Sequence, residues 1–173
     1  FILCTGYRGE MIREFFRGNE FDAQFEFSDA GEKASMLLRL HRAKELMSER
    51  VFVAYGDTLV DVDQAEMLSE HVTSGASVTI TVASVRSPVG LVTTESDGWV
   101  VSFEEKPVQS YYVGHMLLER NALNDLDPKL LAMPDGDGLV KLFSLLISQR
   151  LLHKYAYIGP QITFNTRQEL HQA

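Results

Sequence analysis

The 173-residue sequence has almost no cysteine and no long hydrophobic run. Its single cysteine, Cys4, cannot form an internal disulfide, and its place in the apolar run 1–4 predicts a small buried side chain, not a nucleophile. No stretch approaches the roughly 18 uninterrupted apolar residues of a membrane span, and no basic start followed by an apolar segment indicates a secretion signal. These absences predict a soluble, cytoplasmic protein with no membrane partner.

Positive charge is also scarce, since 24 acidic residues face 16 basic ones and the formal net charge is −8. Nucleic-acid surfaces need clustered Lys and Arg, so the balance argues against a nucleic-acid partner. Small anionic substrates stay compatible with it, provided that a divalent cation and a few local basic residues offset the repulsion. The five histidines show no metal-ligand spacing.

The length and the 45% hydrophobic content predict a single domain over residues 1–173 with one substantial core. The sequence opens on Phe1 instead of Met and enters an apolar run at once. We therefore expect the complete protein to contain residues before Phe1.

Hydrophobic periodicity predicts alternating strands and helices in the first half. The predicted order is strand 1–5, helix 11–16, strand 21–27, helix 34–47, strand 51–55, a helix from Asp63 to the break at Gly75, and strand 78–82. The uncharged, β-branched strand 51–55 is expected to be parallel and buried on both faces. Asp63 is expected to cap the helix that follows it.

In the second half, the runs 90–92 and 99–101 flank the turn signal Ser96-Asp97-Gly98 and predict a β-hairpin. Further predicted elements are strand 111–118, a largely buried helix 138–152, a strand or strand pair 155–164 and a short helix 167–172. Together these elements predict an α/β protein with three α/β/α layers and a mostly parallel mixed sheet.

Asp57 is the sharpest candidate for chemistry. It ends the sequence Tyr55-Gly56-Asp57, directly after a predicted buried strand. Ligands of open α/β sheets bind at the carboxyl ends of the strands, and Mg²⁺ prefers hard oxygen ligands such as a carboxylate. These residues fit an alternative equally well, in which Asp57 only starts a turn and caps local amides, as Gly-Asp after a strand often does. Asp61 fits a cap better than a ligand.

Lys106 is the second candidate. It follows the predicted hairpin in Phe103-Glu104-Glu105-Lys106-Pro107, where a lysine could neutralise phosphate oxygens as a point charge. These residues taken alone favour a solvated charged turn, because charge runs usually face water.

Tyr55-Gly56-Asp57, then Asp61-Val62-Asp63, then Phe103-Glu104-Glu105-Lys106-Pro107 resembles the order found in sugar-1-phosphate nucleotidyltransferases. Residues 1–9 with Ile12, Phe15-Phe16 and the run 28–31 are most similar to the glucose-1-phosphate cytidylyltransferase branch. The resemblance implies a GT-A-like fold. It also implies Mg²⁺-dependent attack of a hexose 1-phosphate on the α-phosphorus of a nucleoside triphosphate such as CTP, with release of pyrophosphate.

The resemblance also implies roles for individual residues. Asp57 matches the metal-binding aspartate, Lys106 the lysine on the sugar phosphate, and Glu105 the acceptor for sugar hydroxyls. The remaining substrate-binding positions that it implies are Gly56, Gly90, Gly114 and Arg39.

The sequence departs from the family pattern in three places. Asn165 stands in place of the second metal-binding aspartate and offers an oxygen without the charge. His115 replaces a glycine of the sugar pocket, and Met36-Leu37-Leu38 replaces a threonine and two glycines near the nucleotide. Asn165 is the only candidate here for a second metal ligand.

The family's glycine-rich loop, with its arginine and lysine, would precede Phe1. A chain that begins at Phe1 is therefore expected to have little or no transferase activity. The sequence leaves open a catalytically degenerate binding or regulatory module on the same fold, and it leaves open a homo-oligomer. A Rossmann-type dinucleotide binder fits less well, because no Gly-x-Gly-x-x-Gly follows a predicted strand. If the protein is the nucleotidyltransferase that the resemblance implies, it would serve surface-polysaccharide or deoxysugar synthesis.

Overall fold

The computed structural model describes residues 1–164 and 166–172, which form two compact units. The first unit consists of Phe1–Phe52, Gly75–Val78 and Leu117–Leu152. The second consists of Val53–Ser74, Thr79–Met116 and His153–Ala173. No helix in the described part of the chain has both the length and the apolar character needed to cross a membrane.

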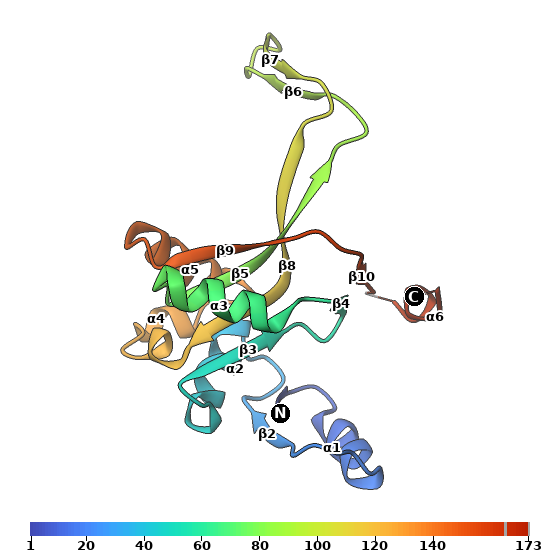
Figure 1. The fold of residues 1–173 in the computed structure, drawn as a ribbon, viewed down its shortest axis with the longest axis vertical. Helices are drawn as coiled ribbons and strands as arrows, with labels where there is room; N and C mark the ends of the chain where they lie inside the picture. Colours follow the sequence, from blue (N-terminus) through green and yellow to red (C-terminus); the bar gives the residue numbers. More distant parts are fainter. Residues whose placement is uncertain (165, 173) are drawn as a thin grey trace. The chain divides into compact units, whose positions relative to one another are not determined.

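The first unit opens with a strand–helix–strand arrangement (Figure 1). Strand β1 (Ile2–Thr5) pairs in parallel with β2 (Glu26–Asp29), so that Thr5 lies opposite Asp29 where both strands end. Helix α1 (Gly9–Gly18) connects them and packs Phe16 against Phe25, with 4.4 Å between ring centroids. The expected strand 1–5 and helix 11–16 are confirmed here, whereas the strand predicted over 21–27 begins only at Glu26 and extends to Asp29.

Cys4 corrects one expectation, because it is exposed and not buried. Strand β1 belongs to a two-stranded sheet. Both strands of a two-stranded sheet are edge strands, so such a sheet leaves more of its side chains uncovered than the interior of a wider sheet does.

The core of the first unit is helical. Helix α2 (Met36–Ala43) continues into a 3₁₀ turn (Lys44–Leu46), and three further segments follow later in the chain: a 3₁₀ turn (Arg120–Leu123), α4 (Pro128–Leu131) and α5 (Asp137–Ser148). Their buried apolar side chains are Leu37, Leu40, Ala43, Leu123, Leu139, Leu142 and Leu146.

Helix α5 is shorter and less buried than the predicted helix 138–152. Leu139, Leu142 and Leu146 face the core, whereas Val140 and Ile147 are 63% and 64% exposed. The apolar residues therefore surround the helix, but only one face is covered, which the apolar composition alone could not reveal.

A four-stranded sheet has the strand order β3-β8-β5-β9. Its strands are β3 (Arg50–Ala54), β8 (Val108–Glu119), β5 (Val78–Arg86) and β9 (Leu152–Tyr157). Strand β3 was expected to be buried on both faces, and this prediction is wrong. It lies at the edge of the strand order, and Phe52 is 42% exposed. The interior strand β5 carries the buried run instead.

The second unit adds two antiparallel pairs. Strand β4 (Thr58–Val60) pairs with β10 (Gln161–Thr163), and β6 (Leu91–Thr94) pairs with β7 (Val100–Glu104) in the hairpin that Figure 1 shows. The predicted hairpin is confirmed, with Gly98 at a φ of 95° in its turn. Every residue of β6 and β7 is exposed.

Two helices complete the second unit. Helix α3 (Gln64–Ser74) follows Asp63, whose Oδ1 accepts a hydrogen bond from the Glu66 amide at 2.9 Å, so the predicted cap is confirmed. Helix α6 (Arg167–Gln172) ends the described chain, as expected.

Candidate functional site

Asp57 lies exposed in the turn between β3 and β4, at the end of the strand that was predicted to deliver it. Its main-chain oxygen accepts a hydrogen bond from the Phe164 amide at 3.0 Å. This bond holds the chain that leaves β10 against the Asp57 turn. Asn165, the predicted second metal ligand, follows in sequence but lies outside the described residues.

A chain of hydrogen bonds orients the Asp57 carboxylate. Thr58 Oγ1 donates to Asp57 Oδ1 at 3.2 Å and lies 3.3 Å from Thr163 Oγ1. Thr163 Oγ1 in turn accepts a hydrogen bond from Gln161 Nε2 at 3.2 Å. If Thr58 donates to the carboxylate, its oxygen is free to accept from Thr163. Thr58 is only 6% exposed, so the hydroxyl that supports Asp57 is shielded from water.

Gly114 is placed where only glycine fits. Its φ is 79°, and a Cβ built on it would lie 2.9 Å from Cδ2 of Tyr55. The Gly114 carbonyl accepts from the Tyr55 amide at 3.0 Å, and Tyr55 packs edge-on against Tyr112 with centroids 5.8 Å apart. Burial raises the pKa of the Tyr112 hydroxyl well above its usual range. Gly56, in contrast, has open space around its Cα.

Lys106 lies in the turn between β7 and β8, with a φ of 47°. Its side chain is 56% exposed, and Nζ lies 3.9 Å from Oε1 of Glu105. The Lys106 carbonyl accepts from Arg86 Nη1 at 3.4 Å, which places the turn beside the end of β5. Gly90 belongs to the same neighbourhood, because a Cβ there would lie 2.9 Å from Cε2 of Phe103 and 3.5 Å from Oε2 of Glu105.

The structure thus brings Gly90, Glu105 and Lys106 together in one cluster and Asp57 with Thr58 in another. No salt bridge joins Lys106 to Asp57, both of which are described. The stretch of β8 from Val108 to Gly114 lies between the two clusters and spans roughly 20 Å at about 3.3 Å per residue.

Arg39 belongs to the first unit, where it is half-buried in the first turn of α2. Its guanidinium donates to main-chain carbonyls. The neighbouring Leu37, at a departure from the family pattern, is fully buried, and a Cβ on Gly138 would lie 3.3 Å from its Cδ2. Leu37 therefore fills core space.

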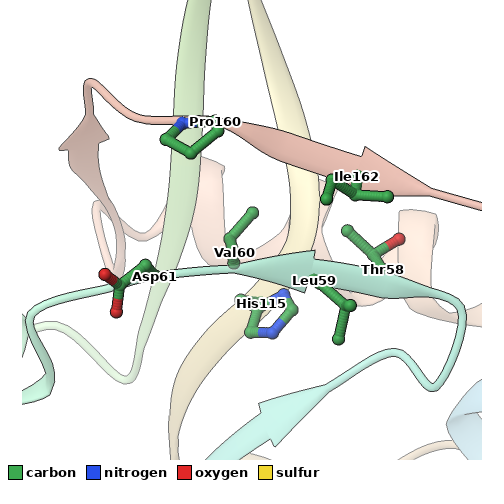
Figure 2. A pocket seen from close by; sticks show the side chains of 7 residues that line it. All are labelled: Thr58, Leu59, Val60, Asp61, His115, Pro160 and Ile162. Atoms are coloured by element: carbon green, nitrogen blue, oxygen red, sulfur yellow. The ribbon is translucent and has the colours of Figure 1, made fainter. Parts of the chain in front are cut away.

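The second unit contains a pocket of about 330 Å³ that sequence reasoning did not predict (Figure 2). Its lining residues are Thr58, Leu59, Val60, Asp61, His115, Pro160 and Ile162. His115 Nδ1 lies 3.3 Å from the Val113 carbonyl, which can only accept, so a hydrogen bond between them requires the proton on Nδ1. The pairing of β4 with β10 builds this pocket, and three-residue strands give too weak a sequence signal to reveal it.

A metal centre made by the protein alone is not visible. In residues 1–164 and 166–172, no group of three or more His, Cys, Asp or Glu side chains could hold a metal ion.

Comparisons with known proteins bear on the family. A family model described as nucleotidyl transferase matches residues 1–124. The glucose-1-phosphate cytidylyltransferase of Salmonella typhi is 28% identical over 163 residues, which cover 80% of this chain and 61% of that protein. The D-glycero-alpha-D-manno-heptose 1-phosphate guanylyltransferase of Aneurinibacillus thermoaerophilus is 30% identical over 112 residues, which cover 63% of this chain and 48% of that protein.

Among solved structures, HddC from Yersinia pseudotuberculosis complexed with GMP-PN superimposes with a TM-score of 0.68 at 14% identity. The match covers 99% of this chain and 76% of that one. It confirms the predicted fold class, a GT-A-like α/β fold with a mostly parallel mixed sheet.

The chain belongs to the nucleotidyl transferase family, because the family model covers well over half of it. It spans about half the length of the curated relatives that it matches.

Proposed function

We propose that the full-length protein transfers a nucleotidyl group from a nucleoside triphosphate to a hexose 1-phosphate and releases pyrophosphate. Family membership supports the reaction type. The observation that carries the proposal is the exposed Asp57 carboxylate, held at a strand end by the buried Thr58 hydroxyl at 3.2 Å. An exposed, oriented carboxylate at that edge suits the binding of a phosphate-bound cation.

Asp57 fits a magnesium ion that arrives with its nucleotide. Mg²⁺ is commonly held by one or two carboxylates together with substrate phosphates, so one oriented carboxylate is a compatible donor set. Thr58 donates to Oδ1 of Asp57, which would leave Oδ2 available to such an ion. A bound Mg²⁺ would neutralise charge that develops on the phosphate oxygens. Asn165 remains a proposed second donor.

Lys106 and Glu105 would hold the sugar phosphate. The Lys106 ammonium is exposed, and among the residues that the structure describes its one ion pair is with Glu105 at 3.9 Å, so its remaining donors are available to phosphate oxygens. Glu105 would accept from sugar hydroxyls, and Gly90 would let the sugar approach the backbone next to Phe103. In the transfer, the sugar phosphate oxygen bonds to the α-phosphorus as the bond to pyrophosphate breaks. This step would require the turn that carries Lys106 to come closer to Asp57 than the roughly 20 Å of β8 that separates the two clusters in this structure.

We propose CTP as the first choice of nucleotide and GTP as the second. The names of the relatives include both a cytidylyltransferase and a guanylyltransferase, at nearly equal identity. The cytidylyltransferase match covers more of the chain, and the sequence pattern of residues 1–9 favours the same branch. The product would enter sugar-nucleotide biosynthesis.

A catalytically degenerate module on the same fold is the second candidate. His115 favours it, because this imidazole lines the pocket beside Leu59 at a position where the family pattern has a glycine (Figure 2). Such a module would bind a sugar nucleotide without turning it over.

Thermal-shift titration of the full-length protein separates the two candidates. CTP, GTP, UTP, TTP and ATP would each be added with and without Mg²⁺, followed by a pyrophosphate-release assay with glucose 1-phosphate. We expect CTP with Mg²⁺ to give the largest rise in Tm. At a hundredfold excess of ligand over Kd, binding adds about 2.7 kcal/mol to the free energy of unfolding. Asp57→Asn should abolish the magnesium dependence. A Tm rise without pyrophosphate release would favour the degenerate module, and no response to any nucleotide would reject both candidates.

A further inference from the structure

Four side chains of the second unit form a hydrogen-bonded relay, which runs from Gln161 through Thr163 and Thr58 to Asp57. Gln161 Nε2 lies 3.2 Å from Thr163 Oγ1, and Thr163 Oγ1 lies 3.3 Å from Thr58 Oγ1. The last link joins Thr58 Oγ1 to Asp57 Oδ1 at 3.2 Å. Strand β10 is thereby connected to the candidate metal ligand by side chains as well as by its backbone.

The two ends of the relay fix the direction of every hydrogen bond in it. The side-chain nitrogen of Gln161 can only donate, and the Asp57 carboxylate can only accept. Each threonine hydroxyl carries one proton, so Thr163 accepts from Gln161 and donates to Thr58. The Thr58 proton then goes to Asp57. Three protons therefore serve three links.

The pairing of β4 with β10 places these groups beside one another. Thr163 lies opposite Thr58, and Gln161 lies opposite Val60. Residues two apart in a strand share a face, as do residues directly opposite each other in an antiparallel pair. Thr58 is only 6% exposed, so its hydroxyl oxygen depends on Thr163 instead of water for an incoming proton.

We propose that Thr163 is a positioning residue for the Asp57 carboxylate, and that Gln161 sets the direction in which Thr163 donates. Thr163 acts through Thr58, because a Thr58 oxygen that receives a proton from β10 keeps its own proton on Oδ1 of Asp57. The orientation of the carboxylate thus depends on a residue that follows Thr58 by 105 positions. The cation that Asp57 would bind rests on the proposed function, whereas the relay rests on the three contacts alone.

The expected size of the effect follows from the geometry of the links. Both hydroxyl–oxygen distances exceed the roughly 2.7–2.8 Å that is most common for O–H···O bonds, and Gln161 and Thr163 are exposed. Single hydrogen bonds of this kind contribute little net free energy. Loss of one link should therefore change cation binding several-fold and leave the fold intact.

Gln161→Glu separates the relay from other roles of this side chain. The variant keeps the shape but replaces a donor by an acceptor, so two protons remain for three links. Hydrogen bonds to carboxylates are the stronger ones, so the link between Thr163 and Thr58 should break. The added negative charge by itself would attract a cation more strongly. A weaker magnesium response in this variant would therefore oppose the electrostatic effect and point to the relay.

Three further variants complete the set. Thr163→Val keeps the branched shape but removes the middle hydroxyl, whereas Thr163→Ser retains that hydroxyl. Gln161→Leu removes the terminal donor and leaves two protons for the two remaining links. Gln64→Glu is the control for charge, because it adds the same charge at an exposed glutamine of the second unit, at the start of α3.

The measurements use the full-length protein. Without nucleotide or metal, the NMR couplings between Hα and the two Hβ protons of Asp57 report whether its χ1 angle is fixed or averaged. Amide hydrogen exchange of Phe164, which donates to the Asp57 carbonyl at 3.0 Å, reports whether the chain after β10 stays attached. The magnesium concentration for half-maximal pyrophosphate release from CTP is then measured for each variant.

We expect a single χ1 rotamer of Asp57 in the wild type, in Thr163→Ser and in Gln64→Glu, and averaging in Thr163→Val and Gln161→Glu. The half-maximal magnesium concentration should rise about fivefold in Thr163→Val and Gln161→Glu and less than about twofold in Gln161→Leu. Thr163→Ser and the control should match the wild type. Exchange of the Phe164 amide should be the same in all of these proteins.

An averaged Asp57 in the wild type would overturn the proposal, because the relay would then not hold the carboxylate. A tighter magnesium response in Gln161→Glu would overturn it in favour of charge, and a larger effect of Gln161→Leu would overturn it in favour of shape. Faster Phe164 exchange in Thr163→Val, or no rescue by Thr163→Ser, would reduce Thr163 to a structural residue. Expected χ1 changes in a protein without magnesium-dependent turnover would support the relay and reject the proposed function.

Discussion

Arg39 and Lys106 are both cations implied for substrate binding, yet their surroundings are opposite. Around Arg39, the helix is capped and buried, and three carbonyls occupy the guanidinium. Around Lys106, every residue of the preceding strand β7 is exposed, and the ammonium has one ion pair at 3.9 Å. A cation whose donors are already used acts through the backbone that it holds, whereas a cation with free donors can act on a ligand.

The largest effect should come from the buried side of this comparison. Leu37→Ala should lower the free energy of unfolding by about 2–5 kcal/mol, because Leu37 is fully buried next to Gly138 and the cavity cannot fill completely. Urea denaturation measures the change. Val101→Ala in the exposed hairpin is the matched control and should stay within about 0.5 kcal/mol. Equal losses at both positions would erase the difference between the two regions.

On the exposed side, Lys106→Met should reduce kcat of the full-length protein on the order of 100-fold, because a charge aimed at a phosphate is lost. Its Tm should not change, since the side chain is 56% exposed and weakly paired. Steady-state kinetics and thermal denaturation check the two parts. Lys154→Met, at an exposed lysine of β9, serves as control. A large Tm loss in Lys106→Met would mean that this lysine, like Arg39, is structural.

A smaller effect is expected at Thr58, whose side chain is buried while the neighbouring Asp57 is exposed. Thr58→Val keeps the shape but removes the hydroxyl that donates to Asp57, and it should cost about 1–2 kcal/mol of stability. The magnesium concentration that gives half-maximal activity should also rise. Thr58→Ser retains the hydroxyl and should restore the magnesium response. If valine and serine gave the same magnesium dependence, the hydroxyl would have no part in orienting Asp57.

A pH-dependent effect is expected at Tyr155, a buried polar group that is satisfied like Arg39 but carries no charge. Its hydroxyl donates to Glu66 Oε2 at 2.5 Å, and this bond, with burial and nearby carboxylates, raises the pKa of Tyr155 to about 12. The folded state therefore holds the proton more tightly than the unfolded state, whose pKa is near 10.0. The resulting stabilisation is complete below pH 10 and is lost as the pH rises from 10 to 12.

Tyr155→Phe tests this directly. The difference in unfolding free energy between wild type and variant should shrink across pH 10 to 12. A difference that stays constant over that range would show that the Glu66 bond does not hold the proton.

Local signals predicted the fold where the structure depends on neighbours in sequence. The hairpin followed from Gly98 and its turn residues, and the cap of α3 followed from Asp63. The burial of β3 was misjudged because strand order is a tertiary property: Phe52 is apolar, but its strand lies at an edge. Composition indicates which side chains can be buried, whereas the strand order decides which of them other elements cover.

The candidate site was accessible from sequence only in part. Tyr55-Gly56-Asp57 and Glu105-Lys106-Pro107 marked positions through motif order, and these assignments stay predictions. The pairing of Thr58 with Thr163 joins residues far apart in the chain, so no local pattern indicates the hydroxyls beneath Asp57. The bonds of Arg39 are hidden for the same reason, because their acceptors are backbone atoms that every residue has.

The Tyr157 hydroxyl donates to the Pro160 carbonyl at 2.8 Å and accepts from the Asp61 amide at 3.2 Å, so one oxygen fastens the bend before β10 to the exit of β4. Between these anchors, Ile158 is completely exposed. A protease that nicks the chain at Ile158 would therefore sever the covalent connection without releasing the tail at once, since the β4–β10 pairing would still retain it. The fragment would behave as a bound peptide whose departure could be timed.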